Sequence, residues 1–125
     1  KSPSGMPEAG YIPIPKKLAQ AGVKDMIRIS DCRMSGTAFG TIVLHVTPEA
    51  AMGGAIGLVQ NGDEIRLSIS NKSLELLVDD AELDRRRQAN PARPARPSRG
   101  YAKLYADHVM QADRGADFDF LMAPS

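Results

Sequence analysis

Residues 26–46 read MIRISDCRMSGTAFGTIVLHV, and the rest of the chain is organised around them. Met26 to Ile29 predicts a short buried strand, and the β-branched run from Thr41 to Val46 predicts a second. The loop 30–40 between them holds two glycines, hydroxyl side chains, an acid and an arginine. Glycine lets the backbone approach a ligand closely, and functional groups gather on loops held by a rigid scaffold. This loop is therefore the best candidate site.

Length and composition predict one small globular domain, because 125 residues with 42% hydrophobic content can bury a modest core. A net charge of +1 gives no field that would favour nucleic acid or a membrane. The single cysteine favours a reducing compartment, so we expect a cytoplasmic protein. The sequence shows neither a transmembrane run nor a signal-peptide pattern. Because it begins at Lys1 in a loop-forming segment, we expect a piece of a longer or processed protein.

The region after the candidate loop predicts a β-hairpin. Apolar and polar residues alternate over 65–69 and again over 74–78, which is the period of a half-buried strand. Turn residues at 71–72 separate the two runs. A further short apolar run, Ala55 to Val59, predicts another strand.

Helices are predicted at four places by their capping residues and apolar spacing. They are 16–21, stopped by Gly22; 48–52, with Thr47 as N-cap and Pro48 at the first position; 79–87, with acids first and bases last; and 101–112. The arginines of 79–87 complement the helix dipole and lack an aromatic platform, so we expect no nucleic-acid binding. Pattern alone thus gives an α+β domain of short strands and helices.

Few side chains suggest chemistry by themselves. Glu8, in the proline- and glycine-rich segment 1–10, is either a solvated surface carboxylate or one presented to a hard cation or a substrate. His45 on its apolar strand is packed or hydrogen-bonded, with a catalytic role as the alternative, and His108 is a structural histidine. Paired zinc ligands, a phosphate-binding glycine fingerprint and a nucleophile elbow are absent from the sequence.

A set of longer motifs covers nearly the whole chain. They are Gly-Met-Pro-Glu at 5–8, Ser-Asp-Cys-Arg-Met-Ser-Gly-Thr at 30–37, His-Val-Thr-Pro-Glu-Ala at 45–50, Gly-Gly at 53–54, Asn-Gly-Asp at 61–63, Arg-Gly-Tyr at 99–101 and Asp-His-Val-Met-Gln-Ala-Asp at 107–113. Together they resemble the C-terminal domain of the dihydroxy-acid dehydratase/phosphogluconate dehydratase family. The form Met-Ser-Gly-Thr-Ala-Phe-Gly at 34–40 is similar to the sugar-acid branch, which acts on arabinonate, xylonate or similar aldonates.

The resemblance implies a swivelling β-barrel-like domain of mixed strands flanked by short helices. Its parts are a loop (1–10), a barrel core (11–89), a proline- and arginine-rich connector (90–100), and a C-terminal helix and tail (101–125). The family's larger N-terminal domain, which holds its iron–sulfur cluster, is absent from these 125 residues. We expect that domain and a sugar-acid substrate as partners, no nucleic acid or membrane, and a dimer or tetramer of the full-length enzyme.

The resemblance also implies a hydro-lyase that converts a 2,3-dihydroxy acid into the 2-keto-3-deoxy acid and water. In the family, the open iron of a cluster, here expected as 2Fe–2S, acts as a Lewis acid on the departing C3 hydroxyl. Mg²⁺ holds the substrate carboxylate and C2 oxygen, and Glu8 matches a glutamate that contributes to its binding. Ser35 matches the serine that removes the C2 proton as an alkoxide, and Thr37 matches a second active-site hydroxyl. A nearby cation is needed because a neutral serine is a poor base.

One departure from the family pattern concerns Cys32, which stands where the family usually has alanine or glycine. A lone thiol cannot replace the thiolates that hold an iron–sulfur cluster, so we expect this chain to be inactive alone. Two alternatives stay open. One is a dihydroxy-acid dehydratase of branched-chain amino-acid synthesis, and the other is a stand-alone barrel that serves as a binding or assembly module.

Overall fold

The computed structural model describes residues 12–34, 39–90 and 97–122. Predictions that concern residues 1–11, 35–38, 91–96 and 123–125 lie outside this part of the chain. Among them are the three predicted site residues Glu8, Ser35 and Thr37, the N-terminal loop 1–10 and most of the connector 90–100.

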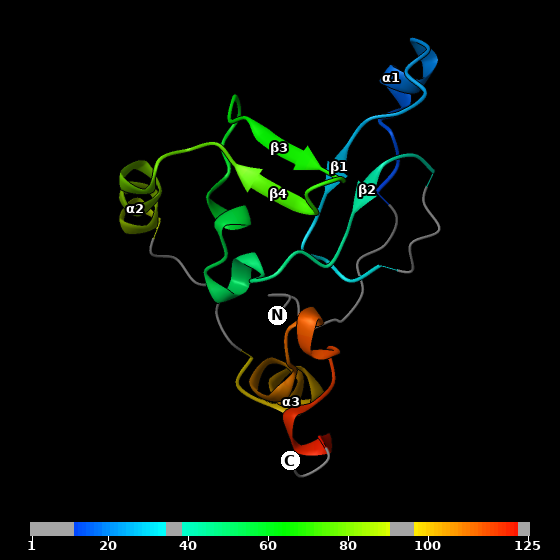
Figure 1. Cartoon of the computed structure of the whole chain (residues 1–125). Helices are drawn as coiled ribbons and strands as arrows, with labels where there is room; N and C mark the ends of the chain where they lie inside the picture. Colours follow the sequence, from blue (N-terminus) through cyan, green and yellow to red (C-terminus); the bar gives the residue numbers. More distant parts are fainter. Residues whose placement is uncertain (1–11, 35–38, 91–96, 123–125) are drawn as a thin grey trace.

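The described strands form two small sheets, which lie between helices α1 and α3 in Figure 1. Strand β1 (Arg28–Ile29) pairs in parallel with β2 (Ile42–Val43). Strands β3 (Ile65–Ser68) and β4 (Ser73–Leu76) form an antiparallel hairpin. The predicted hairpin is confirmed. The alternating apolar residues specify its two strands, and the turn at 71–72 between them fixes their register.

Both strands that flank the candidate loop are shorter than predicted. Strand β1 begins at Arg28 rather than Met26, and β2 ends at Val43 rather than Val46. The cause at β2 is His45, whose φ of 57° is left-handed and does not fit a strand. One residue later the chain is again hydrogen-bonded beside β1. Val46 N–H donates to the carbonyl of Ser30, the residue after β1, at 3.2 Å.

The prediction of a strand over 55–59 is wrong. Residues Ala55–Leu58 form a 3₁₀ helix, η2, because a short apolar run does not by itself distinguish a strand from a buried helical turn. Gly54 occupies the N-cap position of this helix and is buried. A Cβ at Gly54 would lie 1.7 Å from the Pro48 carbonyl oxygen, so only glycine fits where the chain folds back on itself.

The helix predicted at 48–52 begins later than expected. It is a single 3₁₀ turn, η1 (Ala50–Met52), and Glu49 rather than Thr47 occupies its N-cap position. Gly53 ends it in a left-handed conformation with a φ of 86°, as the Gly-Gly pair predicts.

Helices α1 and α2 follow their sequence signals closely, whereas α3 ends early. Helix α1 spans Lys16–Gln20 and α2 spans Asp80–Ala89, where Asp79 Oδ1 accepts from Glu82 N–H at 2.9 Å as the N-cap. Helix α3 is shorter than predicted, because it spans Gly100–His108 and Val109 is already extended. Two 3₁₀ turns follow, η3 (Ala112–Arg114) and η4 (Asp119–Leu121), and an isolated bridge joins Val109 to Phe118.

The apolar core formed by the described residues is small. Among the described residues, the buried hydrophobic side chains are Met34, Leu83, Tyr105 and Val109. The α+β class is confirmed. The described segments form no closed barrel, so the barrel stays a prediction. No described helix is long and apolar enough to cross a membrane.

Candidate functional site

The loop between β1 and β2 is held at both ends by buried or half-buried polar side chains. Its described parts are residues 30–34 and 39–40, on either side of the segment that contains Ser35 and Thr37. The contacts at each end therefore fix the two points in space between which the middle of the loop runs.

Arg33 fixes the N-terminal end of the loop to α3. Its Nη1 donates to Tyr105 Oη at 2.5 Å, and its Nη2 donates to Glu49 Oε1 at 2.9 Å and to the Met110 carbonyl at 2.8 Å. The side chains of Arg33 and Glu49 are only 10% and 5% exposed. Burial raises the pKa of the Tyr105 phenol, although Arg33 opposes the shift, so this hydroxyl stays protonated at neutral pH. The contacts tie together residues more than 70 positions apart in sequence.

Asp31 and Met34 attach the same end of the loop to the region after β2. Asp31 Oδ2 accepts from Ala50 N–H, the first residue of η1, at 2.7 Å. The main-chain N–H of Met34 lies 3.1 Å from His45 Nε2, and the same ring nitrogen lies 3.3 Å from the Met34 carbonyl oxygen. The left-handed backbone of His45 thus places its ring against the residue that precedes Ser35.

Gly40 closes the C-terminal end of the loop against Asp25. Its φ is 89°, and a Cβ there would lie 2.3 Å from Asp25 Oδ1 and 2.7 Å from Arg28 Nη2. The Asp25 carboxylate accepts from Thr41 N–H and from Thr41 Oγ1, both at 2.7 Å. Hydrogen bonds from the Thr41 main chain and side chain are the main reason that the pKa of Asp25 is lowered.

Arg28 lies beneath this same end of the loop and is 7% exposed. Its guanidinium donates to the carbonyl of Phe39 and, at 2.7 Å, to the carbonyl of Ile12. Its Nε donates to the Met26 carbonyl at 3.3 Å. Two arginines, the buried Arg28 and the half-buried Arg33, therefore hold the two ends of one loop.

Comparison with known proteins identifies the scaffold that carries this loop. Residues 1–116 match the family described as dihydroxy-acid/6-phosphogluconate dehydratase, C-terminal. The chain belongs to this family. The candidate loop, residues 30–40, lies well inside the matched region.

Several full-length relatives of this dehydratase C-terminal domain are similar over most of the chain. A 6-deoxy-6-sulfo-D-gluconate dehydratase of Pseudomonas putida is 53% identical over 95% of this chain and 21% of its own length. An L-arabonate dehydratase of Azospirillum brasilense is 52% identical over 94% of this chain and 21% of its own. A dihydroxy-acid dehydratase of Syntrophobacter fumaroxidans is 47% identical over 74% of this chain and 17% of its own. The chain thus spans about a fifth of the length of the curated relatives it matches.

The two histidines, His45 and His108, make different contacts in the structure. His45 contacts the main chain of Met34 in the candidate loop, as described above. His108 Nδ1 lies 3.0 Å from Asp119 Oδ1, and its ring packs edge-on against Phe120 with centroids 5.2 Å apart. His108 therefore supports the C-terminal tail, in agreement with the predicted structural role.

The positioning residues of the loop were missed by sequence reasoning. Glu49 and Tyr105 carry no local signal, because their importance comes from contacts with Arg33 across the fold. Arg28 did carry a local signal, because a charged residue inside the apolar run 26–29 must find hydrogen-bonding partners if that run is buried. Within the described ranges, no three histidine, cysteine or acidic side chains come together as metal ligands.

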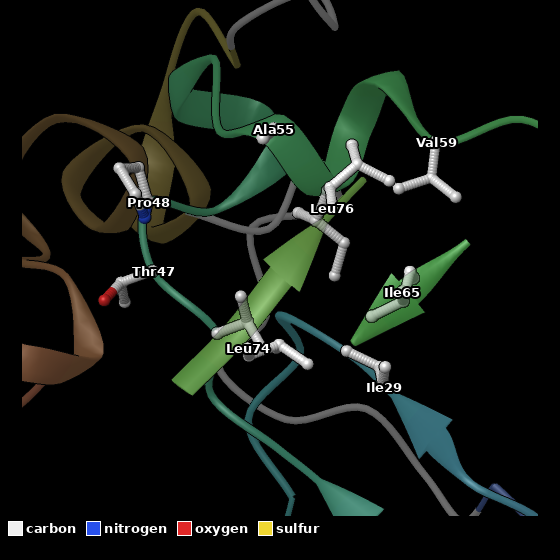
Figure 2. Close-up of a pocket in the computed structure, with 10 residues that line it drawn as sticks. Ile29, Thr47, Pro48, Ala55, Val59, Ile65, Leu74 and Leu76 are labelled. Atoms are coloured by element: carbon white, nitrogen blue, oxygen red, sulfur yellow. The ribbon is translucent and has the colours of Figure 1, made fainter. Parts of the chain in front are cut away.

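An apolar pocket of about 180 Å³ opens between the hairpin, β1 and the 3₁₀ turns (Figure 2). Aliphatic side chains dominate its lining, and none of the lining residues is charged: Ile29, Val46, Thr47, Pro48, Ala55, Ile56, Val59, Ile65, Leu74 and Leu76. A sugar acid carries a carboxylate and several hydroxyls, which need charged and hydrogen-bonding partners. This pocket is therefore unsuited to such a ligand, and the candidate site remains the loop.

Proposed function

We propose that this chain is the C-terminal domain of a hydro-lyase that converts a 2,3-dihydroxy sugar acid into the 2-keto-3-deoxy acid and water. Family membership supports a dehydratase, and two of the relatives above are named for sugar-acid substrates. The observation that supports the proposal is the loop 30–40, which holds the serine that matches the family motif and whose described ends are fixed by Arg28 and Arg33. Such anchoring suits a loop that must present a base at a fixed position.

Ser35 is the proposed base. Its Oγ, as an alkoxide, takes the proton from C2 of the substrate while the hydroxyl at C3 leaves. The proton then passes from Ser35 to the leaving hydroxide, which is released as water and restores the alkoxide. The resulting enol becomes the ketone when its hydroxyl proton moves to C3. Thr37 offers a second hydroxyl two residues away, with which the substrate oxygens can form hydrogen bonds. Both residues lie outside the described part of the chain, so these roles rest on the family match and on the anchoring of the flanking residues.

The residues of this chain do not fit an iron–sulfur cluster. Such clusters take several cysteine thiolates, and Cys32 is the single cysteine. We therefore assign the proposed 2Fe–2S cluster to the part of the full-length protein outside this chain. Magnesium differs, because it takes hard oxygen ligands and Glu8 can supply one carboxylate. When bound, the ion would supply positive charge that holds the substrate carboxylate and C2 oxygen.

The proposed partner is the N-terminal domain of the same polypeptide. The curated relatives are about five times as long as this chain, so most of their length lies elsewhere. We propose that the swivelling barrel is completed in the full-length protein, that this protein is a cytoplasmic dimer or tetramer, and that the isolated chain is inactive.

The activity is tested by assaying the full-length protein with arabinonate, xylonate, gluconate and dihydroxyisovalerate side by side. The proposal expects turnover of at least one aldonate to exceed that of dihydroxyisovalerate. The reverse preference would instead support the second candidate, a dihydroxy-acid dehydratase, which the relative from Syntrophobacter fumaroxidans favours. Aldonate binding to the isolated 125-residue chain, measured by calorimetry, would support a stand-alone binding module.

A further inference from the structure

The apolar pocket of Figure 2 is lined entirely by residues that are half-buried or exposed. They come from β1, the segment before η1, η2 and the hairpin. Two of them, Val59 and Ile65, are each 39% exposed. Aliphatic surface gathered from four parts of the chain is therefore still in contact with solvent in the structure.

The hairpin turns its apolar face toward this pocket. Ile65 of β3 pairs with Leu76 of β4, and both line the pocket together with Leu74. The neighbouring pair, Arg66 and Glu75, lies on the opposite face of the hairpin, because successive side chains of a strand alternate. Both members of this pair are exposed and form an ion pair with each other. One apolar and one polar face are typical of an antiparallel sheet that packs on a core with one side.

The size and chemistry of the pocket favour an apolar side chain as its occupant. Its volume is about 180 Å³, whereas sites for small molecules usually have at least roughly 300 Å³. An aliphatic cavity of about 150 Å³ accommodates benzene, which is similar in size to the ring of a phenylalanine side chain. None of the lining residues is charged, so a polar ligand would lose hydrogen bonds to water without replacement. A large aliphatic or aromatic side chain, inserted from outside, matches both properties.

The two sheets beside the pocket also need further packing. Among the described residues, each sheet has only two strands. A hairpin alone is marginally stable in water and needs a third strand or packing against another element. A parallel pair such as β1 and β2 occurs almost only where both of its faces are covered. The cover of this pocket is therefore needed for the fold itself, and not only for assembly after folding.

Another segment of the same polypeptide meets this need better than a second copy of the chain. A tethered segment is present at an effective concentration of roughly millimolar, whereas a second copy must arrive by diffusion at a much lower concentration. The region that this chain matches is 21% of the length of two curated relatives, so about four fifths of their length lies outside it. Full-length proteins of this length have both the tether and enough chain to supply the cover.

We propose that the apolar pocket between the hairpin, β1 and η2 receives apolar side chains from the part of the full-length polypeptide outside residues 1–125. This packing completes the core against the inner face of the hairpin. The inference rests on the partner domain of the proposed function, and it adds the surface on which that domain packs. It does not depend on the proposed reaction.

The test measures thiol alkylation in the full-length protein for Ile65→Cys and Val59→Cys. Arg66→Cys, on the opposite face of β3, is the control. Modification by iodoacetamide at each position is followed by peptide mass spectrometry, and each rate is compared with that of the same variant unfolded in denaturant. In a filled pocket, a thiol reacts only when the structure opens locally, so at both pocket positions folding should slow the reaction at least about tenfold more than in the control.

The inference is overturned if either pocket thiol is protected by less than this factor. Should one of the two variants fail to fold, the other decides, because Val59 and Ile65 lie on different elements and are equally exposed.

Photocrosslinking identifies the occupant. A diazirine side chain placed at position 59 of the full-length protein should form a link to a peptide outside residues 1–125 of the same polypeptide. A link to a peptide within residues 1–125 of the same polypeptide would assign the cover to this chain. A link that joins two polypeptides would assign it to a second copy. Either of these two results would overturn the proposal.

Aldonate turnover, measured on the same preparations, separates this inference from the proposed reaction. Protected thiols in a protein that dehydrates no aldonate would support the filled pocket and contradict the reaction. Unprotected thiols in a protein with full turnover would do the reverse.

Discussion

The buried pair Arg33 and Glu49 is the residue-scale feature that ties the candidate loop to α3. Their side chains are 10% and 5% exposed and approach to 2.9 Å. Removing both charges from such a pair is often tolerated, but removing one leaves the other buried without compensation. The pair is therefore sensitive to single substitutions, and its effect on the loop follows from the position of Arg33 two residues before Ser35.

Glu49→Gln should destabilise the full-length protein by about 3 kcal/mol, because it leaves the Arg33 charge buried. Turnover should also fall, since Arg33 then loses its fixed place. Denaturant unfolding and steady-state kinetics measure the two effects. Glu75→Gln is the control, because its pair with Arg66 is exposed and such pairs contribute only about 0–1 kcal/mol. Equal effects of both substitutions would contradict a special role for the buried pair.

Gly40→Ala should lower kcat of the full-length protein by at least about tenfold. The added Cβ would lie 2.3 Å from Asp25 Oδ1, so either the Asp25 carboxylate or the end of the Ser35 loop must move. A displaced carboxylate would lose its hydrogen bonds to Thr41, the residue after the loop, and small displacements of a base are costly. Gly62→Ala is the matched control, because Gly62 has a similar φ of 96° but nothing within 4 Å of its Cβ position. Normal kcat in Gly40→Ala would show that the close contact does not set the loop position.

At the scale of elements, local signals predicted structure well where capping or strand alternation was clear. The hairpin of β3 and β4 and the helix α2 with its Asp79 N-cap follow from such signals. The wrong strand at 55–59 is a short apolar run without alternation, which tertiary contacts around Gly54 fold into η2. The candidate loop itself was found from its residues. Its anchors were not, because Arg33, Glu49 and Tyr105 meet only in the folded chain.

A cluster of charged side chains attaches helix α2 to the turn before the hairpin, and the stability that it contributes depends on pH. Arg86 binds Asp63 with contacts of 2.6 and 3.0 Å and binds Glu82 at 2.7 Å. The hydrogen bond from Arg86 lowers the pKa of Asp63. Hydrogen bonds from Arg85 and Arg86 lower the pKa of Glu82 from 4.5 to about 2.

Because these folded-state pKa values are depressed, the stability they contribute is present above the unfolded values and is lost as pH falls. For Glu82, the loss should occur between pH 4.5 and about 2. Thermal midpoints measured across this range should fall less steeply in Glu82→Gln than in the unmodified protein. An identical slope in both proteins, or a Glu82 carboxyl that titrates at its ordinary pKa by NMR, would contradict this account.

At the scale of the whole molecule, exposed hydrophobic side chains on the described residues indicate surface that another part of the protein could cover. Large hydrophobic side chains such as Phe39, Ile69 and Phe120 are 56–85% exposed, and the relatives are about five times longer. Both observations fit a domain whose proposed site is completed by another part of the same protein. The sequence motifs predicted such a partner domain through their family resemblance, but they did not indicate which side chains it covers, because surface coverage is a property of the assembled molecule.

The most direct measurement is the activity of the full-length protein with Ser35→Ala, beside Ser70→Ala, an exposed serine of the hairpin turn. Because loss of a general base costs about 10²–10⁴-fold, Ser35→Ala should bind the sugar acid with nearly unchanged affinity in calorimetry and lose dehydration by that factor. Ser70→Ala should keep both. Near-normal turnover in Ser35→Ala would contradict the proposal that this chain supplies the base.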